Sequence, residues 1–240
     1  MTARQQAIDS KRNLLVVLRL LLSILCPSLS LCVFVVNPSL ASAQANRRSL
    51  ASEHFRVWYP ADAEQREIDT VLRALEAARR DLRRRLEAAG VDPAVPSLVE
   101  VNIHRTTGDF AGATGQPPWA AGVTRGRRIE LQPLAVLRRR GVLATTLRHE
   151  YAHVAIEALG RGRTPRWITE GLAAHFAGEG PLLARAGQEP SVSDAELEEK
   201  LSGPASAREM RALYAAAYLK VREMIRAEGE SSVWRRVAQG

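Results

Sequence analysis

Cysteine is almost missing from this chain of 240 residues. Its only two cysteines, Cys26 and Cys32, both lie in an apolar segment near the N-terminus. The rest of the chain can therefore form no internal disulfide and can offer no thiolate to a metal ion. Any metal held there must be bound by histidine, aspartate or glutamate side chains.

The patterns of several other function classes are also missing. No glycine-rich stretch ends in Gly-Lys-Ser or Gly-Lys-Thr, which excludes a phosphate-binding loop. Without residues 1–43 the net charge falls from +8 to +5, which is a modest excess without a nucleic-acid recognition motif, so no nucleic-acid partner is expected. Only this charge favours a basic nucleic-acid binder as a third hypothesis. The arginine-rich stretch 79–87 predicts a solvated helix face whose arginines pair with glutamate and aspartate.

The N-terminus has the composition of an export signal. Lys11 and Arg12 precede a long apolar run (14–36), and the small-residue motif "ASA" follows it as a cleavage site. We therefore predict a signal peptide at 1–43 and a single exported domain at 44–240, periplasmic or secreted. The apolar run is also long enough to span a bilayer, so an uncleaved N-terminal anchor is the alternative. A membrane contact is expected only in that case.

The remaining sequence predicts strands first and helices after them. Apolar alternation predicts strands, and intervals of three and four predict helices. The expected strands are 53–60, 97–105 and a hairpin over 123–133; the expected helices are 63–89, 134–160, 166–178, 194–202 and 206–228, with a loop over 106–122. This order predicts an α+β fold, with a small, mostly antiparallel N-terminal sheet followed by a helical half.

The stretch "HEYAH" at 149–153 carries the clearest chemistry. His149 and His153 lie four residues apart, on one face of a helix, and can point at the same ion. Glu150 lies about 100° around the helix from His149, where it can hold a water molecule without binding the metal. The alternative is an incidental polar pair on the surface of a helix, with no metal.

A metal site of this kind needs a third protein ligand. One class of zinc helix uses a histidine six residues after the second, with a glycine between them. Leu159 and Ile156 occupy these positions, which excludes that class. Glu170, in "WITEGLAAHF", lies 17 residues after His153. A first helix ending near residue 160 and a turn would bring a second helix, and Glu170 with it, back towards the histidines.

"HEYAH" followed by "WITEGLAAHF" resembles the gluzincin metallopeptidases, especially the peptidase MA-like domains. The resemblance is carried by residues 145–178. It implies a zincin-like fold with one zinc ion per chain, bound by His149, His153 and Glu170. It also implies an exported metallopeptidase that hydrolyses peptide bonds with metal-activated water and with Glu150 as the general base.

The same resemblance suggests further parts of a site. The helix over 213–229 is similar to the family's closing helix, so Tyr214 and Tyr218 are candidates to stabilise the oxyanion; packing in the core is the open alternative for both. Strand 128–132 resembles the edge strand beside which a peptide substrate lies. Ala174 departs from thermolysin-like members, which carry an acidic residue there against a ligand histidine. The partner of that histidine must come from elsewhere.

A second hypothesis is a non-catalytic zinc-containing module that holds a peptide or cell-wall partner without cutting it. The glutamate beside the first histidine argues against it, because a purely structural site has no use for a base. Other polar residues are expected to take no part in metal binding. We expect structural roles for His54 and His104. We expect that His175 does not bind the metal and that Glu157 is exposed. Asp109 could border the cleft, but its spacing in the sequence does not require this position.

Overall fold

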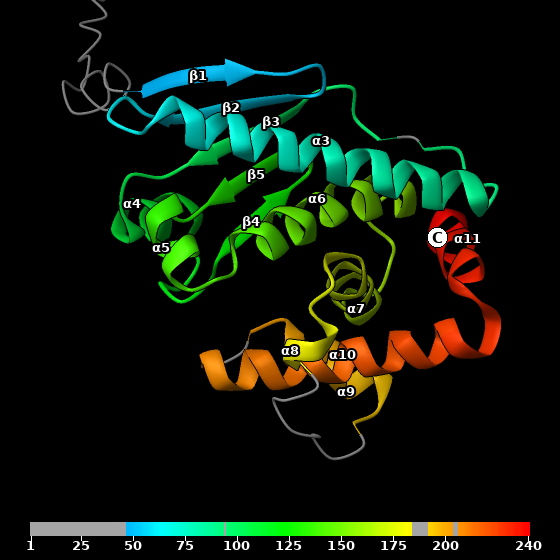
Figure 1. The fold of residues 1–240 in the computed structure, drawn as a ribbon. Helices are drawn as coiled ribbons and strands as arrows, with labels where there is room; N and C mark the ends of the chain where they lie inside the picture. Colours follow the sequence, from blue (N-terminus) through cyan, green and yellow to red (C-terminus); the bar gives the residue numbers. More distant parts are fainter. Residues whose placement is uncertain (1–46, 94, 184–191, 204–205) are drawn as a thin grey trace, which may run out of the picture. The chain divides into compact units, whose positions relative to one another are not determined.

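The computed structural model describes residues 47–93, 95–183, 192–203 and 206–240 and has an α+β fold (Figure 1). The sequence prediction of this class is confirmed. The predicted signal peptide lies outside the described residues. Within the described ranges, no helix has the length and apolar character needed to cross a bilayer.

The strands form one five-stranded sheet in the order β1-β2-β3-β5-β4. Their bounds are β1 Arg47–Ala51, β2 Phe55–Pro60, β3 Val99–Ile103, β4 Gly122–Arg125 and β5 Arg128–Leu131. The outer pairs β1/β2 and β4/β5 are antiparallel, whereas β2/β3 and β3/β5 are parallel. The sheet is therefore mixed, and the expected mostly antiparallel sheet is wrong. Helices α3 (Gln65–Ala88) and α4 (Thr107–Thr114) lie in the connections that let successive strands run parallel.

The edge of the sheet near the helices is β4, and not the predicted strand 128–132. Strand β5 pairs with β3 on one side and with β4 on the other. The predicted hairpin is confirmed, with Gly126 in its turn at a φ of 58°. The sequence indicated the hairpin. It did not show that the second strand, β5, pairs with β3 and that the first strand, β4, forms the edge of the sheet.

The remaining helices follow the sheet along the chain. They are α5 Leu134–Arg139, α6 Leu143–Gly160, α7 Arg166–Ala177, α8 Gly180–Leu183, α9 Asp194–Leu201, α10 Ala207–Glu228 and α11 Glu230–Gln239. The predicted single helix 134–160 is divided in two at Gly141, whose φ of 67° ends the first part. The predicted loop 106–122 contains α4, which begins with a reciprocal capping box between Thr106 and Asp109. Strand β1 and helices α8 and α11 were not predicted.

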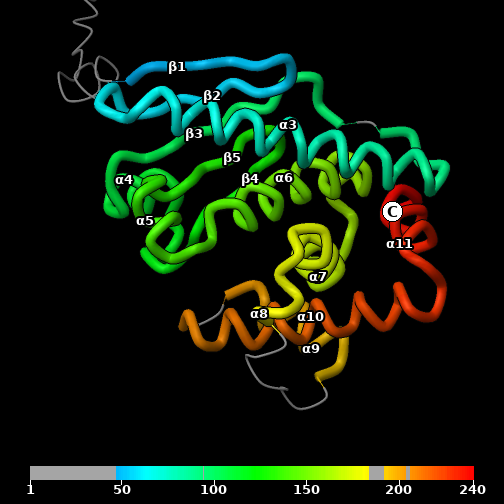
Figure 2. The backbone as a smooth tube through the Cα atoms, viewed as in Figure 1, coloured from blue at the N-terminus to red at the C-terminus, as the bar shows by residue number. Residues whose placement is uncertain are grey.

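Helix α6 packs against both the sheet and other helices. Strand β2 alternates between buried and exposed residues, so one face of the sheet is covered and the other is open. Helices α3 and α6 contact the covered side, and α7 packs on the far side of α6 (Figure 2). A helix covered from two sides is apolar over most of its surface. Its polar residues are therefore buried unless a cavity reaches them.

Helices α7 and α10 approach each other closely at Gly171. A Cβ atom on this residue would overlap the carbonyl oxygen of Ala217 and lie 2.6 Å from Cγ2 of Val221. Glycine is therefore required by the backbone contact between the two helices. Because Gly171 directly follows Glu170, this contact also fixes where Glu170 lies.

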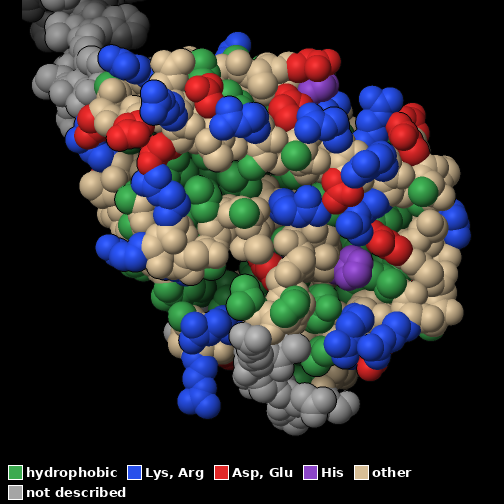
Figure 3. Space-filling model, viewed as in Figure 1, with side chains coloured by type: hydrophobic (Ala, Val, Ile, Leu, Met, Phe, Trp, Pro, Cys, Tyr) green, Lys and Arg blue, Asp and Glu red, His purple; other side chains and the backbone are tan. Residues whose placement is uncertain are grey.

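The arginine-rich face of α3 is paired with acidic residues, as predicted. Arg83 donates to Glu87 over 2.7 Å, and Arg84 and Arg85 both contact Asp81. Figure 3 shows basic side chains, all of them arginines in this helix, interspersed with acidic ones over α3. The arginine-rich face of α3 is therefore a surface of mixed charge.

Candidate metal centre

Helix α6 presents two histidines and a glutamate at one place. His149 and Glu150 are buried, and His153 is partly buried. The two imidazole rings have their centroids 4.8 Å apart. The four-residue spacing places them on one face, as the sequence predicted.

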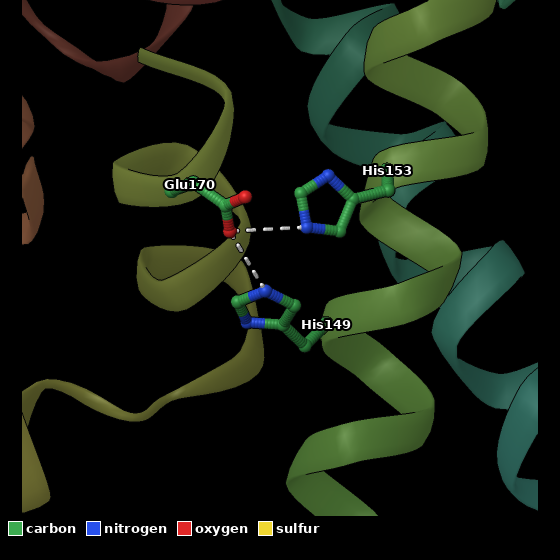
Figure 4. A group of neighbouring side chains, drawn as sticks. All are labelled: His149, His153 and Glu170. Carbon is green, nitrogen blue, oxygen red and sulfur yellow. Dashed lines mark ion pairs between the residues drawn. The ribbon is translucent and has the colours of Figure 1, made fainter. Parts of the chain in front are cut away.

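Glu170 reaches both histidines from α7. Its Oε2 lies 3.4 Å from Nε2 of His149 and 3.3 Å from Nε2 of His153 (Figure 4). One ligand atom from each of the three residues falls within 4.8 Å of the others. The structure thus brings together the three residues that were predicted to bind the metal.

The chemistry of this cluster fits a divalent cation. Oε2 of Glu170 is buried and has no hydrogen-bond partner among the described residues. A buried carboxylate oxygen without a partner is unfavourable, and a cation bound between the three groups would satisfy it. Burial opposes ionisation of Glu170, but His153 and His149 hold its pKa well below the usual range. Two imidazole nitrogens and one carboxylate are a donor set that zinc accepts, with one position left for water.

Glu150 lies beside His149, and residues of the sheet contact its side chain. Its Oε2 accepts a hydrogen bond of 2.8 Å from Oγ1 of Thr124 in strand β4. The α-carbon of Gly122 also approaches, since a Cβ there would lie 3.0 Å from Oε1 of Glu150. Burial raises the pKa of Glu150, against the opposing effect of His153 and His149. A buried carboxylate with a raised pKa beside a cavity has the properties of a general base.

Glu179 is a site residue that the sequence analysis missed. Its Oε2 lies 3.2 Å from Nδ1 of His149, the ring nitrogen that does not face Glu170. Helix α7 ends at Ala177 and is capped by Gly178, whose φ of 79° makes a left-handed turn that directs the next residue back towards α6. Burial would lower the pKa of His149, but Glu179 and Glu170 raise it well above its usual value. The signal in the sequence was Gly178, a glycine at the end of the helix that carries Glu170, followed directly by the acidic residue Glu179.

The structure separates the two candidate tyrosines. The Tyr214 ring stacks on that of His149, with centroids 5.9 Å apart and an angle of 12° between the planes. Burial, and then the charges of Glu170 and Glu150, raise the pKa of Tyr214 well above its usual value. The Tyr218 hydroxyl instead packs against Gly180 of α8, where a Cβ would overlap it. Only Tyr214 borders the candidate centre.

The remaining polar candidates lie outside the cluster. His54 contacts Glu76, His104 contacts Glu130, and His175 contacts Glu230. Asp109 caps α4 and does not line the cavity described below. Glu157 is exposed and accepts a hydrogen bond of 2.9 Å from the backbone N–H of Gly126. These positions agree with the structural roles predicted for His54 and His104 and with the exposed position predicted for Glu157. His175 lies outside the cluster of His149, His153 and Glu170.

A cavity of about 600 Å³ opens onto the cluster. Strand β4 and helices α6, α7 and α10 all contribute to its walls. Its lining includes His149, His153, Glu150, Glu170 and Tyr214, together with apolar side chains. A volume of this size is sufficient for a few residues of a peptide or for a small molecule.

The chain matches no family model, and no curated protein is significantly similar to it. Its function is therefore inferred from its own residues. The features that bear on it are the cluster of His149, His153 and Glu170, the buried Glu150 beside it, the Tyr214 ring stacked on His149, and the edge strand β4.

Proposed function

We propose that the protein is an exported, zinc-dependent metallopeptidase of the gluzincin type, with a zincin-like arrangement of α6 and α7. His149, His153 and Glu170 would hold one zinc ion. The observation that carries the proposal is the buried Oε2 of Glu170, which faces two imidazole nitrogens and has no hydrogen-bond partner in the described part of the chain. Export is proposed from the N-terminal sequence alone.

A zinc ion bound there would lower the pKa of a water molecule and polarise the carbonyl group to be attacked. Glu150 accepts the proton of that water and passes it to the leaving nitrogen. The Thr124 hydroxyl orients the carboxylate for this transfer. The raised pKa of Glu150 brings its basicity closer to neutral pH, where transfer in both directions is efficient.

Tyr214 is the group best placed to stabilise the oxyanion. Its ring lies on that of His149, and it borders the cavity. The raised pKa keeps its phenol protonated at neutral pH, so the hydroxyl can donate a hydrogen bond to the oxygen on which negative charge develops. We assign this role to Tyr214 and not to Tyr218.

Strand β4 offers an open edge to an extended peptide. The N–H of Gln132 donates to the carbonyl of Ala121 over 3.1 Å, so 121, 123 and 125 turn their polar backbone groups towards β5. The backbone N–H and C=O groups of Gly122 and Thr124 then point away from β5, to the unpaired edge of β4. The side chain of Glu150 contacts these two residues. A peptide that adds to this edge would lie beside the base. We therefore place the peptide substrate against β4 and not against β5.

Metal analysis of the full-length protein tests the ligands. We expect roughly one zinc per chain, lost in the Glu170→Ala and His153→Ala variants. His175→Ala is the matched control, because His175 lies on the ligand helix outside the cluster, and this variant should keep its zinc. Full retention of zinc by Glu170→Ala would remove the third ligand.

Peptide cleavage tests the base. Glu150→Gln should keep zinc but lose cleavage that a chelator inhibits, because its amide cannot accept the proton. Cleavage at the native rate by this variant would exclude Glu150 as the base. Zinc binding without cleavage of any member of a peptide library would instead favour a non-catalytic peptide- or cell-wall-binding module.

A further inference from the structure

Three arginines line the cavity at the candidate centre and have no role assigned so far, namely Arg140, Arg166 and Arg211. Arg140 donates a hydrogen bond of 2.8 Å to the carbonyl oxygen of Trp119. Arg166 is the first residue of α7, one turn before Glu170, and its Nε lies 3.7 Å from Oε1 of that residue. Arg211 is on α10, one turn before Tyr214. Arg166 and Arg211 are exposed at the surface and line the same cavity.

The N-terminal half of α10 turns one face to the cavity. The lining residues of this helix are Ala207, Met210, Arg211 and Tyr214. Their spacing of three, four and seven defines a single helix face. The Cβ atoms of Arg211 and Tyr214 are therefore about 5–6 Å apart along it. Arg211 can reach a group that lies next to the Tyr214 hydroxyl.

The acidic residues of the cavity are engaged in hydrogen bonds or ion pairs, whereas Arg166 and Arg211 keep free donors. Glu150 is bonded to Thr124, Glu157 to a backbone N–H, and Glu179 to His149, while Glu170 faces the two histidines. Among the described residues, no hydrogen bond or ion pair engages Arg211. In the same part of the chain, the Arg166 side chain forms an ion pair with the second oxygen of Glu170. Each guanidinium carries five N–H donors, so most of them remain available.

We propose that Arg166 and Arg211 form a carboxylate-binding subsite, so that the preferred substrates are peptides with a carboxylate close to the bond that is cut. The inference rests on the proposed peptidase function. A peptide that extends β4 has side chains alternating to its two faces, so some of them would face the cavity wall that Arg166 and Arg211 line. An aspartate or glutamate side chain and a C-terminal carboxylate present the same group. A guanidinium can bind that group through two parallel hydrogen bonds.

Binding to the zinc-loaded full-length Glu150→Gln variant tests the subsite without hydrolysis. Four fluorescent peptides of one sequence differ only in Glu or Gln at one position and in a free or amidated C-terminus. We expect a carboxylate to tighten binding about tenfold. A Glu-over-Gln preference identifies the side chain as its source, and a free-over-amidated preference identifies the C-terminus. Equal binding of all four peptides overturns the inference.

Matched arginine variants locate the effect. Adding Arg211→Gln to the Glu150→Gln variant should reduce the preference for carboxylate several-fold, and so should Arg166→Gln. Arg208→Gln is the control, because Arg208 is an exposed arginine of the same helix that does not line the cavity. Zinc content and circular dichroism verify that each variant is folded and loaded. If Arg208→Gln weakens the preference as much as Arg211→Gln, general surface charge and not a subsite is responsible.

Hydrolysis by the protein with Glu150 intact separates this inference from the proposed function. Cleavage of all four peptides at equal rates, with equal binding, would leave a peptidase without an arginine subsite. A carboxylate preference in binding, with no peptide cleaved, would leave the subsite in a protein that is not a peptidase.

Discussion

Oε2 of Glu179 lies 3.2 Å from Nδ1 of His149, and Nε2 of the same ring faces Glu170. A carboxylate at Nδ1 favours the tautomer in which that nitrogen carries the proton and Nε2 has a free lone pair. Helix α7 and the residue just beyond its end thus supply both the proposed third ligand and the group that orients the first.

Removal of the Glu179 carboxylate should weaken zinc binding without abolishing it. Glu179→Ala leaves the His149 ring without its acceptor, and we expect the affinity to fall about 10–100-fold. The zinc affinity of Glu179→Gln should fall less, because its amide oxygen can still accept the hydrogen bond from His149. Competition with a chromophoric chelator measures both. Glu199→Ala, at an exposed position of α9, is the control, and equal affinities in the two alanine variants would remove this role.

Gly171→Ala should destabilise the protein and impair zinc binding. The added methyl group meets Ala217 and Val221, so α7 must move away from α10 and carry Glu170 with it. We expect a loss of about 1–3 kcal/mol in the free energy of unfolding, measured with a chelator present. Gly112→Ala in α4 is the control, because its methyl group would meet nothing within 4 Å. Its stability should be unchanged or slightly higher. A native-like stability for Gly171→Ala would contradict the close helix contact.

The two tyrosines should differ in their effect on turnover. Tyr214→Phe removes the proposed oxyanion donor and should lower kcat about 10²–10³-fold while zinc is retained. Tyr218→Phe makes the same chemical change four residues away, where the hydroxyl faces α8 and not the cluster. Steady-state kinetics on one peptide, with zinc content measured in parallel, compares them. An equal loss of kcat in both variants would count against a specific role for Tyr214.

Glu230 should make stability depend on acid pH. Its contact with His175, and then hydrogen bonds from Arg85 and Trp234, lower its pKa to about 2 against the opposing effect of burial. A lowered pKa in the folded state stabilises the protein above the usual pKa of 4.5, and this contribution is lost as pH falls towards 2. Because the group is partly exposed, we expect roughly 1–2 kcal/mol.

Chemical denaturation of the wild type and of Glu230→Gln across this range measures that contribution. The difference between the two proteins should be fully developed above pH 4.5 and should shrink as pH falls from 4.5 towards 2. Glu199→Gln should follow the wild type at every pH. A difference that stays constant with pH would show that Glu230 acts through packing and not through its charge.

Local spacing, together with the family resemblance, was sufficient to predict that His149, His153 and Glu170 lie together. His149 and His153 share a helix face by periodicity, and Glu170 returns because one short turn joins two helices. Glu179 could not be found in this way, because its direction depends on the left-handed turn at Gly178. The division of 134–160 into two helices likewise depends on the backbone angle of Gly141.

The order of the strands in the sheet could not be predicted from the sequence, for a different reason. A hairpin pattern predicts that two strands pair, but it does not state which of them meets a third strand from elsewhere in the chain. Here β5 pairs with β3, and β4 forms the edge over Glu150. The parallel pairs are set by crossovers through α3 and α4, and they depend on packing over long sequence distances.

Helices α6 and α7 carry all three proposed ligands and are joined by a turn of only a few residues. Contacts so near in sequence cost little loop-closure entropy and tend to form early in folding. The parallel pairing of β2 with β3 must instead wait for a 24-residue helix to cross between them. We therefore expect this helical hairpin to gain protection before the sheet does, which pulsed hydrogen exchange during refolding can resolve. Zinc present from the start should then accelerate folding rather than only slow unfolding.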